Sequence, residues 1–334
     1  MNAYEKNSKK CKHTKIKSKK YKSICFSKYL VKYLSLFVFS LLIYKNSFTD
    51  ISKLILEPGR KYIFTFWEPR RKIPGYLRLC IETWKKFLPE YHIEILDYNK
   101  LKYYLGDSLF LSIICKEMTM PIQADGIRVA MLKKYGGIWM DTDTIILGRE
   151  FLNDLKDTEL AMFGDDLYKS QHIGFIYASN TSFLINEWLE QIKKKIYDYK
   201  KVLSKKHNNM DINWINSFKK LYTWSMLGNR IIDPLLKNIT DKRYYSRLDK
   251  HKMNVFPENK YFENNFQDNI KRYREFYFKK GDIEYIINEV KKGIILLHNS
   301  WTPQRFKKMT AKRFIRNDIR ISKLLAKLLN NVTL

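Results

Sequence analysis

The pattern of apolar and polar positions first predicts regular structure between residues 61 and 96. Residues 61–67 are mostly β-branched or aromatic and run into a Glu-Pro turn, which is typical of a short buried strand. Apolar residues then recur at helical spacing over 76–87, between two prolines. Residues 91–96 alternate and predict a second strand. The order strand, helix, strand indicates an α/β sheet with parallel neighbours.

A second helix and strand follow the same logic. The helix predicted over 122–135 ends at Gly136-Gly137, because glycine readily adopts the positive φ required after a last helical turn. An apolar strand at 138–140 follows at once, and a further apolar run lies at 145–147. Ligands bind at the carboxyl ends of strands in open α/β sheets. The acidic turn between these two runs is therefore the first candidate site.

The later half of the chain gives fewer clear patterns. It predicts strands at 173–178 and 293–298, helices at 183–196 and 214–236, and a polar loop at 200–211. Residues 241–280 are rich in Tyr, Asn and Lys and predict no order of elements. We see no internal repeat.

A basic amphipathic helix is expected at the C-terminus, over 311–334. Its apolar residues recur at helical spacing beside several Arg and Lys residues: Ile321, Leu324, Leu325, Leu328, Leu329 and Val332. Such a helix can lie on an anionic membrane. It can equally dock its apolar side on the main domain, and the sequence leaves both alternatives open.

The composition of the N-terminus is typical of a membrane anchor. Residues 1–23 form a lysine-rich basic tail, and an apolar run lies within 24–46. This run falls short of the roughly 20 apolar residues that a membrane span requires, and it contains Lys32. Lysines that reach the headgroups extend its usable length. We expect a single-pass or interfacial anchor, with the tail on the cytoplasmic side; a buried core helix is the alternative.

The net charge and the spacing of the cysteines limit which binding partners and metals the sequence predicts. With 334 residues and 45% hydrophobic content the chain can form a sizeable core. A formal net charge of +29 favours anionic partners, namely a membrane surface, nucleic acid or a phosphorylated substrate, although lysine-rich solvated faces are an ordinary alternative. No nucleic-acid-binding motif is present, so we expect no nucleic-acid partner. The four cysteines form no C-x-x-C pair, which argues against zinc.

The acidic turn has the residues for metal chemistry. Asp141 and Asp143 flank one residue directly after a strand. Mg²⁺ and Mn²⁺ prefer oxygen ligands, and Mg²⁺ usually takes one or two carboxylates together with substrate phosphates. A sugar nucleotide supplies such phosphates, and the metal stabilises charge on the departing diphosphate. We therefore predict a Mn²⁺ or Mg²⁺ cofactor here, against the alternative of a solvated turn with two capping carboxylates.

Asp125 and Arg128 lie three residues apart and share one face of the helix at 122–135. They are consistent with a simple surface pair. They are also suited to ribose or sugar hydroxyls, with the arginine against a phosphate. We favour the second interpretation because the helix leads directly into the Gly-Gly turn and the acidic turn.

Residues 123–143 resemble the sugar-binding, Asp-x-Asp region of glycosyltransferase family 32. More closely, they resemble bacterial capsular polysaccharide synthesis glycosyltransferases, whose pattern joins an Asp-x-x-Arg helix to a Tyr-Gly-Gly turn and an Asp-x-Asp strand end. With Trp67, Trp84 and residues 298–301, the resemblance covers about residues 60 to 305. It implies a GT-A type, Rossmann-like nucleotide-sugar-binding fold over 60–310. It also implies a nucleotide-sugar donor, a divalent metal and net retention at the anomeric carbon.

The resemblance also implies roles for individual residues. By position, Trp67 would lie beside the nucleobase. Asp125 and Arg128 would bind the donor sugar and ribose. Asp141 would contact the ribose and a metal-bound water, and Asp143 would bind the metal directly.

The strand at 293–298 leads into a second group implied by the resemblance, His298, Asn299, Ser300 and Trp301. These four residues would close over the diphosphate, with the histidine as a further metal ligand and the other three binding the donor. The histidine and the tryptophan are equally consistent with core residues.

Two departures from the family pattern leave the donor and the acceptor open. Gln171-His172-Ile173-Gly174 stands where related enzymes often carry Asn before the Gly, and Gly228-Asn229 stands where they often have Gly-Pro. No nucleophilic carboxylate can be assigned, and Asp165 and Asp166 are candidates by placement only. A front-face mechanism, in which the leaving phosphate takes the acceptor proton, would require none.

The sequence as a whole predicts a hexosyltransferase of capsular or surface polysaccharide synthesis. It would use a UDP- or GDP-sugar and a saccharide or lipid-linked acceptor, with its catalytic domain on the cytoplasmic side of a bacterial inner membrane. The alternatives are a Golgi type II enzyme with a lumenal domain, a non-catalytic GT-A membrane scaffold, and a basic nucleic-acid-binding protein.

Overall fold

The structure is a computed structural model that describes Leu56 and residues 60–165, 170–206, 225–251, 266–290 and 293–329. The chain divides into two compact units, Met1–Glu57 and Pro58–Leu334, and all described residues except Leu56 belong to the second. The predicted basic tail at 1–23 and the predicted anchor at 24–46 lie outside the described residues. Among the helices that the structure describes, none is long and apolar enough to cross a membrane.

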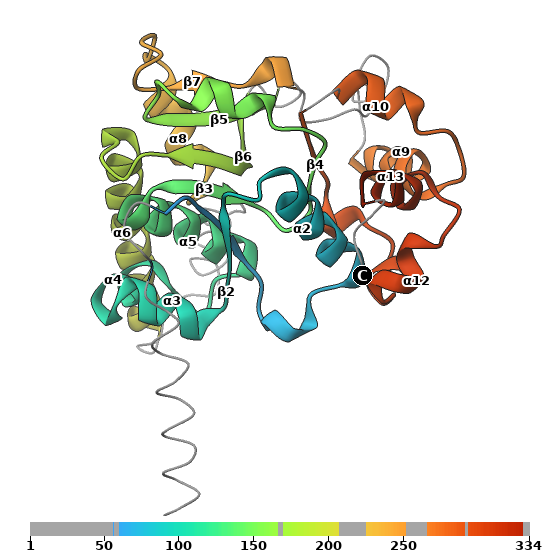
Figure 1. Cartoon of the computed structure of the whole chain (residues 1–334). Helices are drawn as coiled ribbons and strands as arrows, with labels where there is room; N and C mark the ends of the chain where they lie inside the picture. The colour runs from blue at the N-terminus through green and yellow to red at the C-terminus, as the bar shows by residue number, and fades with distance from the viewer. Residues whose placement is uncertain are drawn as a thin grey trace, which may run out of the picture. The chain divides into compact units, whose positions relative to one another are not determined.

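A mixed six-stranded sheet with the order β2-β1-β3-β6-β5-β7 forms the centre of this unit (Figure 1). Its strands are β1 (Tyr62–Phe66), β2 (His92–Leu96), β3 (Gly137–Met140), β5 (Leu160–Asp165), β6 (Ser170–Ala178) and β7 (Ser246–Arg247). β1 pairs in parallel with β2 and β3, while β6 pairs antiparallel with β3 and β5. The predicted α/β class and the parallel start of the sheet are confirmed.

A second, two-stranded sheet stands beside the first. It pairs β4 (Thr144–Ile146) antiparallel with β8 (Ile294–Leu296). The acidic turn connects β3 of the large sheet to β4 of the small one. The pairing of β4 with β8 therefore brings the C-terminal part of the chain to this turn.

Helices cover both faces of the large sheet, because successive strand residues point to opposite sides. On one face, Ile63 of β1 shares a core cluster with Trp84 of α2 (Gly75–Phe87). On the other face, the ring of Phe64 lies 6.1 Å from that of Tyr135 in α5 (Met120–Tyr135). All five residues of β1 are buried, as this central position requires.

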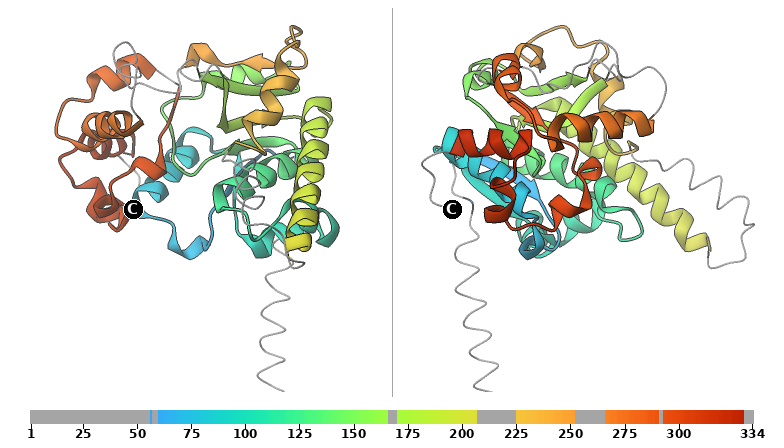
Figure 2. Two further views of the ribbon diagram at one scale, coloured as in Figure 1. Left: turned by 180° about the vertical axis from the view of Figure 1, so that it is seen from behind. Right: turned by 90° about the vertical axis from the view of Figure 1, so that its right-hand side faces the viewer.

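The remaining helices fall into two groups on either side of the sheet (Figures 1 and 2). One group includes α3 (Tyr98–Leu105), α4 (Asp107–Ile113), α6 (Phe183–Lys206) and α8 (Asn229–Leu236). The other gathers beside α2 and includes α9 (Phe266–Phe278), α10 (Glu284–Val290), α11 (Gln304–Lys307), α12 (Ala311–Ile315) and α13 (Arg320–Leu329). Short 3₁₀ turns complete the unit: η2 (Arg70–Lys72), η3 (Glu150–Leu155), η4 (Asp249–His251) and η6 (Asn299–Trp301).

Some predicted boundaries are wrong. Helix α6 continues to Lys206, so the loop predicted at 200–211 is wrong for its first seven residues. Lysine is a good helix former, and a polar stretch therefore extends a helix as easily as it ends one. Of the helix predicted over 214–236, residues 214–224 lie outside the described residues, residues 225–228 form a turn, and α8 accounts for the rest. The interval 241–280, which predicted no elements, holds β7 and α9.

The C-terminal segment forms two helices where one was expected over 311–334. Asn317 follows α12, and its Nδ2 donates to the carbonyl oxygen of Arg313 at 2.7 Å, which caps the end of that helix. The apolar residues of α13 are buried in a core cluster with residues of α2 and α9. The apolar side of α13 is thus docked on the main domain, the second of the two alternatives.

Candidate functional site

The turn that carries Asp141 and Asp143 is held by both sheets. The N–H of Asp141 donates to the carbonyl of Gly174 at 2.8 Å and so extends the pairing of β3 with β6. The carbonyl of Asp143 accepts from the N–H of Leu297 at 3.1 Å and extends the pairing of β4 with β8. The N–H of Thr144 closes the turn on the carbonyl of Asp141 at 3.0 Å. Each acid is therefore fixed by a different sheet.

Each of the two carboxylates is held by other residues through one of its oxygens. Asp141 Oδ1 accepts from Trp139 Nε1 at 2.9 Å and lies 3.5 Å from Arg128 Nη2. Asp143 Oδ2 accepts from the N–H of Asn299 at 2.7 Å. Among the described residues, no other residue donates a hydrogen bond to Asp141 Oδ2 or Asp143 Oδ1. The Asp141 side chain is 37% exposed, so the turn keeps oxygen ligands that a cation can reach.

Arg128 joins the acidic turn to α5. Its Nη2 lies 3.1 Å from Asp125 Oδ1, its Nη1 donates to the carbonyl of Ile173, and its guanidinium lies 5.4 Å from the centroid of the Trp139 ring. Arg128 and Asp125 are 5% and 1% exposed. A simple surface pair is therefore excluded. The arginine instead bridges the two carboxylates of Asp125 and Asp141.

Asp125 is closed off from solvent. Burial raises the pKa of its carboxyl to about 7, Arg128 opposes this shift, and Asp141 adds to it. Its Oδ2 has no hydrogen-bond partner. Gly228 covers this oxygen, because a Cβ at that position would lie only 2.8 Å from it. A donor hydroxyl would reach Asp125 only after a shift of the backbone at Gly228.

The carboxyl of Asp143 is electrostatically unfavourable as an anion. Its pKa is raised to about 7, mainly by burial and then by the neighbouring Asp141, while the N–H of Asn299 opposes the rise. Burial disfavours the charged form of a carboxyl group, and a nearby cation favours it. A divalent ion at this turn would therefore relieve an unfavourable charge.

The 3₁₀ turn η6 follows β8 and lies against the acidic turn. The N–H of His298 donates to the hydroxyl of Tyr273 at 3.0 Å, and the His298 ring lies 4.1 Å from the Trp301 ring at an angle of 30°. The carbonyl of Trp301 accepts from Arg274 Nε at 2.7 Å. Trp301 is buried, whereas Ser300 is exposed. The turn is thus anchored in the core through its aromatic rings.

Asn299 connects this turn to α2. Its side-chain Oδ1 accepts from the hydroxyl of Tyr76, whose pKa is raised well above its usual value by burial and by Asp143. Trp67, at the end of β1, is half-buried against the core cluster that contains Trp301. The two predicted tryptophans therefore pack on one cluster, beside the chain of hydrogen bonds from Asp143 through Asn299 to Tyr76.

His172 is a site residue that the sequence singled out only as a departure from the family pattern. Its ring lies 6.3 Å from that of His298, and its Nδ1 accepts from the N–H of Gly174 at 3.1 Å. Burial lowers the pKa of both imidazoles to about 4. Both rings are therefore neutral near pH 7, and the accepting Nδ1 places the His172 proton on Nε2.

Lys307 is a further residue that the sequence did not indicate. It lies on α11, and burial followed by the neighbouring Arg274 lowers its pKa, while Asp143 opposes the shift. A cation thus stands within electrostatic reach of the acidic turn. No periodicity or motif in 304–310 distinguishes this lysine from its neighbours, because its position depends on how α11 packs.

The three predicted metal ligands do not come together as one complete metal site. In the part of the chain that the structure describes, no group of three or more His, Cys, Asp or Glu side chains is placed to hold a metal ion, so Asp141, Asp143 and His298 do not form such a group. The two open carboxylate oxygens still fit a cation that takes one or two carboxylates and completes its shell with substrate phosphates. The side chain of Asp165 and the whole of Asp166 lie outside the described residues.

Comparison with known proteins identifies the family. Residues 6–292 match the family described as "Capsular polysaccharide synthesis protein". The chain belongs to the capsular polysaccharide synthesis protein family. The predicted resemblance to this family is confirmed, and the match includes the helix and the acidic turn from Asp125 to Asp143. It ends before the η6 turn at 298–301. No curated protein matches this family member.

Several solved structures are similar to this capsular polysaccharide synthesis protein. GlyE, a glycosyltransferase of Streptococcus pneumoniae TIGR4, has 13% identity and a TM-score of 0.35 over 80% of this chain. This chain spans 63% of the length of GlyE. The galactosyltransferase LgtC has 11% identity and a TM-score of 0.36, covering 81% of this chain and 97% of its own. A glycosyltransferase involved in glycosylation of the major capsid of PBCV-1 has 12% identity and a TM-score of 0.35, over 74% and 97%.

Proposed function

We propose that this capsular polysaccharide synthesis protein is a metal-dependent glycosyltransferase of GT-A type. It would move a hexose from a UDP- or GDP-sugar to a saccharide or lipid-linked acceptor. The observation that carries the proposal is the acidic turn, where Asp141 and Asp143 each keep one carboxylate oxygen to which no other described residue donates. This turn follows the carboxyl end of β3, where open α/β sheets bind their ligands.

Asp143 and Asp141 would hold Mn²⁺ or Mg²⁺, which when bound supplies Lewis-acid stabilisation of the diphosphate leaving group. The protein would prepare this site by fixing the carboxylates in advance. Trp139 Nε1 and Arg128 orient Asp141, and the N–H of Asn299 orients Asp143. Preorganised charges and dipoles of this kind require no rearrangement during the reaction.

Further residues would bind the donor around this centre. Lys307 would attract the diphosphate, because Asp143 lies near enough to raise the pKa of its ammonium electrostatically. His172 retains a proton on Nε2 that can be donated to a phosphate or sugar oxygen. From the family resemblance we propose that Trp67 lies beside the nucleobase and that Asp125 and Arg128 bind the sugar and ribose. Gly228 would then have to move to open Asp125.

We propose that the reaction retains the anomeric configuration by a front-face route. In this route the acceptor oxygen forms the new bond to the anomeric carbon while the bond from that carbon to the diphosphate oxygen breaks. The leaving phosphate oxygen takes the acceptor proton. No carboxylate nucleophile is required.

The place of the enzyme is proposed from the sequence. The apolar run within 24–46 would anchor it in a bacterial inner membrane, and the lysine-rich residues 1–23 would stay in the cytoplasm with the catalytic domain. Anionic headgroups would add to this attachment, since each basic residue near such a surface contributes about 1 kcal/mol.

A donor panel tests the activity directly. The full-length protein, purified in detergent, would be incubated with Mn²⁺ or Mg²⁺ and with a series of UDP- and GDP-sugars, and nucleotide release would be measured. We expect release from one or a few donors, and its loss on addition of EDTA. Metal-dependent binding of UDP or GDP without any release would support the non-catalytic scaffold. Salt-sensitive retention on DNA without nucleotide binding would support a nucleic-acid-binding protein.

A further inference from the structure

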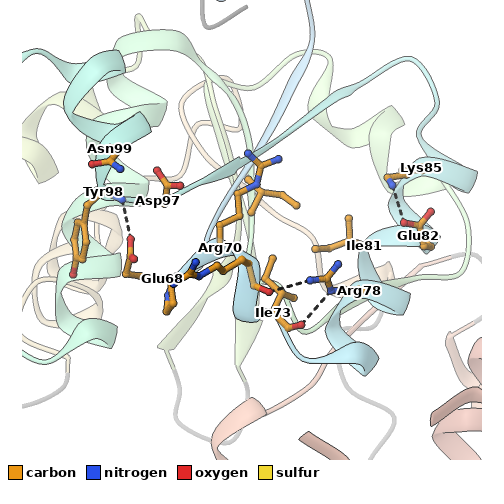
Figure 3. A pocket seen from close by; sticks show the side chains of 13 residues that line it. Glu68, Arg70, Ile73, Arg78, Ile81, Glu82, Lys85, Asp97, Tyr98 and Asn99 are labelled. Atoms are coloured by element: carbon orange, nitrogen blue, oxygen red, sulfur yellow. Dashed lines mark hydrogen bonds and ion pairs between the residues drawn. The ribbon is translucent and has the colours of Figure 1, made fainter. Parts of the chain in front are cut away.

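A cavity of about 840 Å³ opens beside the carboxyl ends of β1 and β2 (Figure 3). Its walls come from the segment that leads into η2, from the outer side of α2, and from the end of β2 with the start of α3. The charged residues among its lining are Glu68, Arg70, Arg71, Arg78, Glu82, Lys85 and Asp97. None of the residues assigned above to the metal or the donor lines this cavity.

The three acids in the lining are already occupied. Glu68 Oε2 accepts from the N–H of Tyr98 at 3.1 Å, and Asp97 Oδ1 accepts from the N–H of Lys100 at 2.9 Å. Both bonds secure the first turn of α3. Glu82 Oε1 pairs with Lys85 Nζ at 2.7 Å on the outer face of α2 (Figure 3). The negative charges of the cavity thus have structural partners.

Two of the four cations are also occupied. Lys85 is paired with Glu82, and Arg78 donates to the carbonyls of Ile73 and Arg71, each at 3.2 Å. The bonds from Arg78 hold the backbone of η2 in place beside the cavity. The arginine therefore acts as a support for this turn, and its guanidinium is directed to backbone oxygens.

The guanidinium groups of Arg70 and Arg71 are the remaining charges. Neither makes an ion pair or a side-chain hydrogen bond with any residue in the described ranges, and both residues are exposed. They sit next to each other on η2, whose backbone is fixed by Arg78 and by the bond from the N–H of Lys72 to the carbonyl of Pro69 at 2.9 Å. The cavity therefore has two adjacent cations without partners on a fixed backbone.

This arrangement suits an oxyanion. A guanidinium presents its N–H groups as a planar fork that fits the two oxygens of a carboxylate or phosphate. An isolated pair of like charges is unfavourable, and an anion between them would relieve it. The cavity is also large enough to hold a saccharide unit beside such an anion, since ligand pockets typically measure about 300–1,000 Å³.

The cavity lies on the same edge of the sheet as the acidic turn. β2, β1 and β3 are parallel neighbours, so their carboxyl ends meet at that edge. Adjacent strands are about 4.8 Å apart, which puts the end of β2 roughly 10 Å from the end of β3. A molecule held in the cavity can therefore extend a sugar toward the turn that carries Asp141.

We propose that this cavity binds an anionic group, a phosphate or a carboxylate, and that Arg70 and Arg71 are its ligands. Assigning that anion to the acceptor rests on the proposed function. The anion site itself does not, because it follows from the two arginines and the cavity. An acceptor phosphate of a lipid-linked saccharide and the carboxylate of a sugar acid are the two sources of such a group.

The test compares the full-length protein with the double variant R70Q/R71Q and with K72Q. Lys72 belongs to the same turn and is exposed but does not line the cavity, so it controls for loss of charge alone. Binding of inorganic phosphate and of glucuronate would be measured by calorimetry with saturating UDP or GDP present to occupy the donor site. Because hydrogen bonds to charged groups are worth about 1.5–3 kcal/mol, we expect R70Q/R71Q to bind the preferred probe about tenfold more weakly or worse. K72Q should bind as the parent does.

The possible results distinguish a failure of the proposed anion site from a failure of the proposed glycosyltransferase activity. Equal affinity of the parent, R70Q/R71Q and K72Q for both probes would overturn the site. So would equal losses in the double variant and in K72Q. Donor-only nucleotide release should have the same KM in R70Q/R71Q as in the parent, and a raised donor KM would make the cavity a donor subsite. If phosphate binding depends on the two arginines while the parent releases nucleotide from no donor, the site stands and the proposed function fails.

The single variants R70Q and R71Q keep the test informative if the double variant fails to fold. Each removes one exposed guanidinium and keeps the backbone carbonyls that Arg78 binds. Unchanged thermal unfolding of each, with an intermediate loss of probe affinity, is the expected result. Full affinity in both singles would contradict the assignment of both arginines as ligands.

Discussion

The backbone N–H of Asn299 donates to Asp143 Oδ2 at 2.7 Å, across 156 positions of the sequence. Asp143 leads into β4 and Asn299 follows β8, so the antiparallel pairing of these strands makes the bond possible. Burial and the neighbouring Asp141 raise the pKa of this carboxyl to about 7, and the bond from Asn299 opposes that rise. The small sheet thus prepares a buried acid to act as an anion.

Asp143→Asn should abolish transfer and leave the fold intact. The amide keeps the size of the carboxylate and an oxygen that can accept from Asn299, but it loses the negative charge that would bind the metal. We expect metal-dependent nucleotide release to fall by about 100-fold or more. Release would be measured at saturating Mn²⁺ beside circular dichroism and thermal unfolding.

Asp198→Asn is the matched control for this change. Asp198 is exposed on α6, so the same loss of one carboxylate should leave release unaltered. Turnover of Asp143→Asn at the parent rate would remove the metal assignment. Loss of the folded state in Asp143→Asn would instead show that the carboxylate is required for structure.

Stability should fall as the pH rises from about 4 to about 7, in part because of Asp125. Its pKa in the folded protein is raised to about 7 by burial, while an unfolded aspartate titrates near 3.9. Between these values the folded state binds a proton that the unfolded state has released. The free energy of unfolding therefore decreases with pH over this window.

Asp125→Asn removes this titration, so its unfolding free energy should decline less between pH 4 and 7. Urea unfolding at several pH values would compare the slopes of the variant and the parent. The absolute stability of the variant is not the readout, because an amide also changes the contact with Arg128. Parallel slopes for the two proteins would mean that Asp125 ionises normally.

The core of the site could be predicted because its signals are local. The helix before Gly136-Gly137, the strand after it and the two acids follow one another in 22 residues, and each depends on short-range geometry. The family match over residues 6–292 confirms the resemblance read from this same stretch. The position of the acidic turn after a strand also predicts that it lies at the ligand-binding edge of the sheet.

The surroundings of the site could not be predicted in the same way. Tyr76 bonds Asn299 from α2, and Lys307 on α11 is electrostatically coupled to Asp143; only tertiary packing brings these helices together. The burial of Asp125 under Gly228 likewise depends on a loop placed more than 100 positions away. A surface pair and a buried, bridged pair on α5 have the same spacing. The sequence therefore suggested the residues but not their exposure.

Gly75→Ala should weaken the attachment of the C-terminal helices. Gly75 begins α2, and a Cβ there would lie 2.3 Å from the nitrogen of Ala311 and 2.5 Å from the oxygen of Met309. Both are backbone atoms, so the two segments must separate. We expect a loss of about 1–3 kcal/mol in the free energy of unfolding. Hydrogen exchange across 311–329 should become faster.

Gly106→Ala gives the comparison for this variant. Gly106 has φ +76°, but nothing lies within 4 Å of an added Cβ. Its φ of +76° and ψ of 159° lie in a region that is essentially restricted to glycine, so its cost should be backbone strain of about 1–3 kcal/mol, without faster exchange in α12 and α13. If hydrogen exchange in 311–329 became equally faster in both variants, the close contact of Gly75 would not be what holds this segment in place.

Deletion of residues 1–46 should release the protein from membranes and preserve donor turnover. The second compact unit begins at Pro58, so the deletion removes no residue of that unit. The apolar side of α13 is buried in the core cluster and is not available to a bilayer. Fractionation of cells that express the parent and the truncated protein would measure the change, with nucleotide release as the second readout.

Full membrane retention of the truncated form would point to the residues between Thr302 and Asn317, which carry six basic residues and no acidic residue. An anionic surface would then be the principal attachment, and raised salt should release the truncated protein, whereas it should not release a chain held by an apolar anchor.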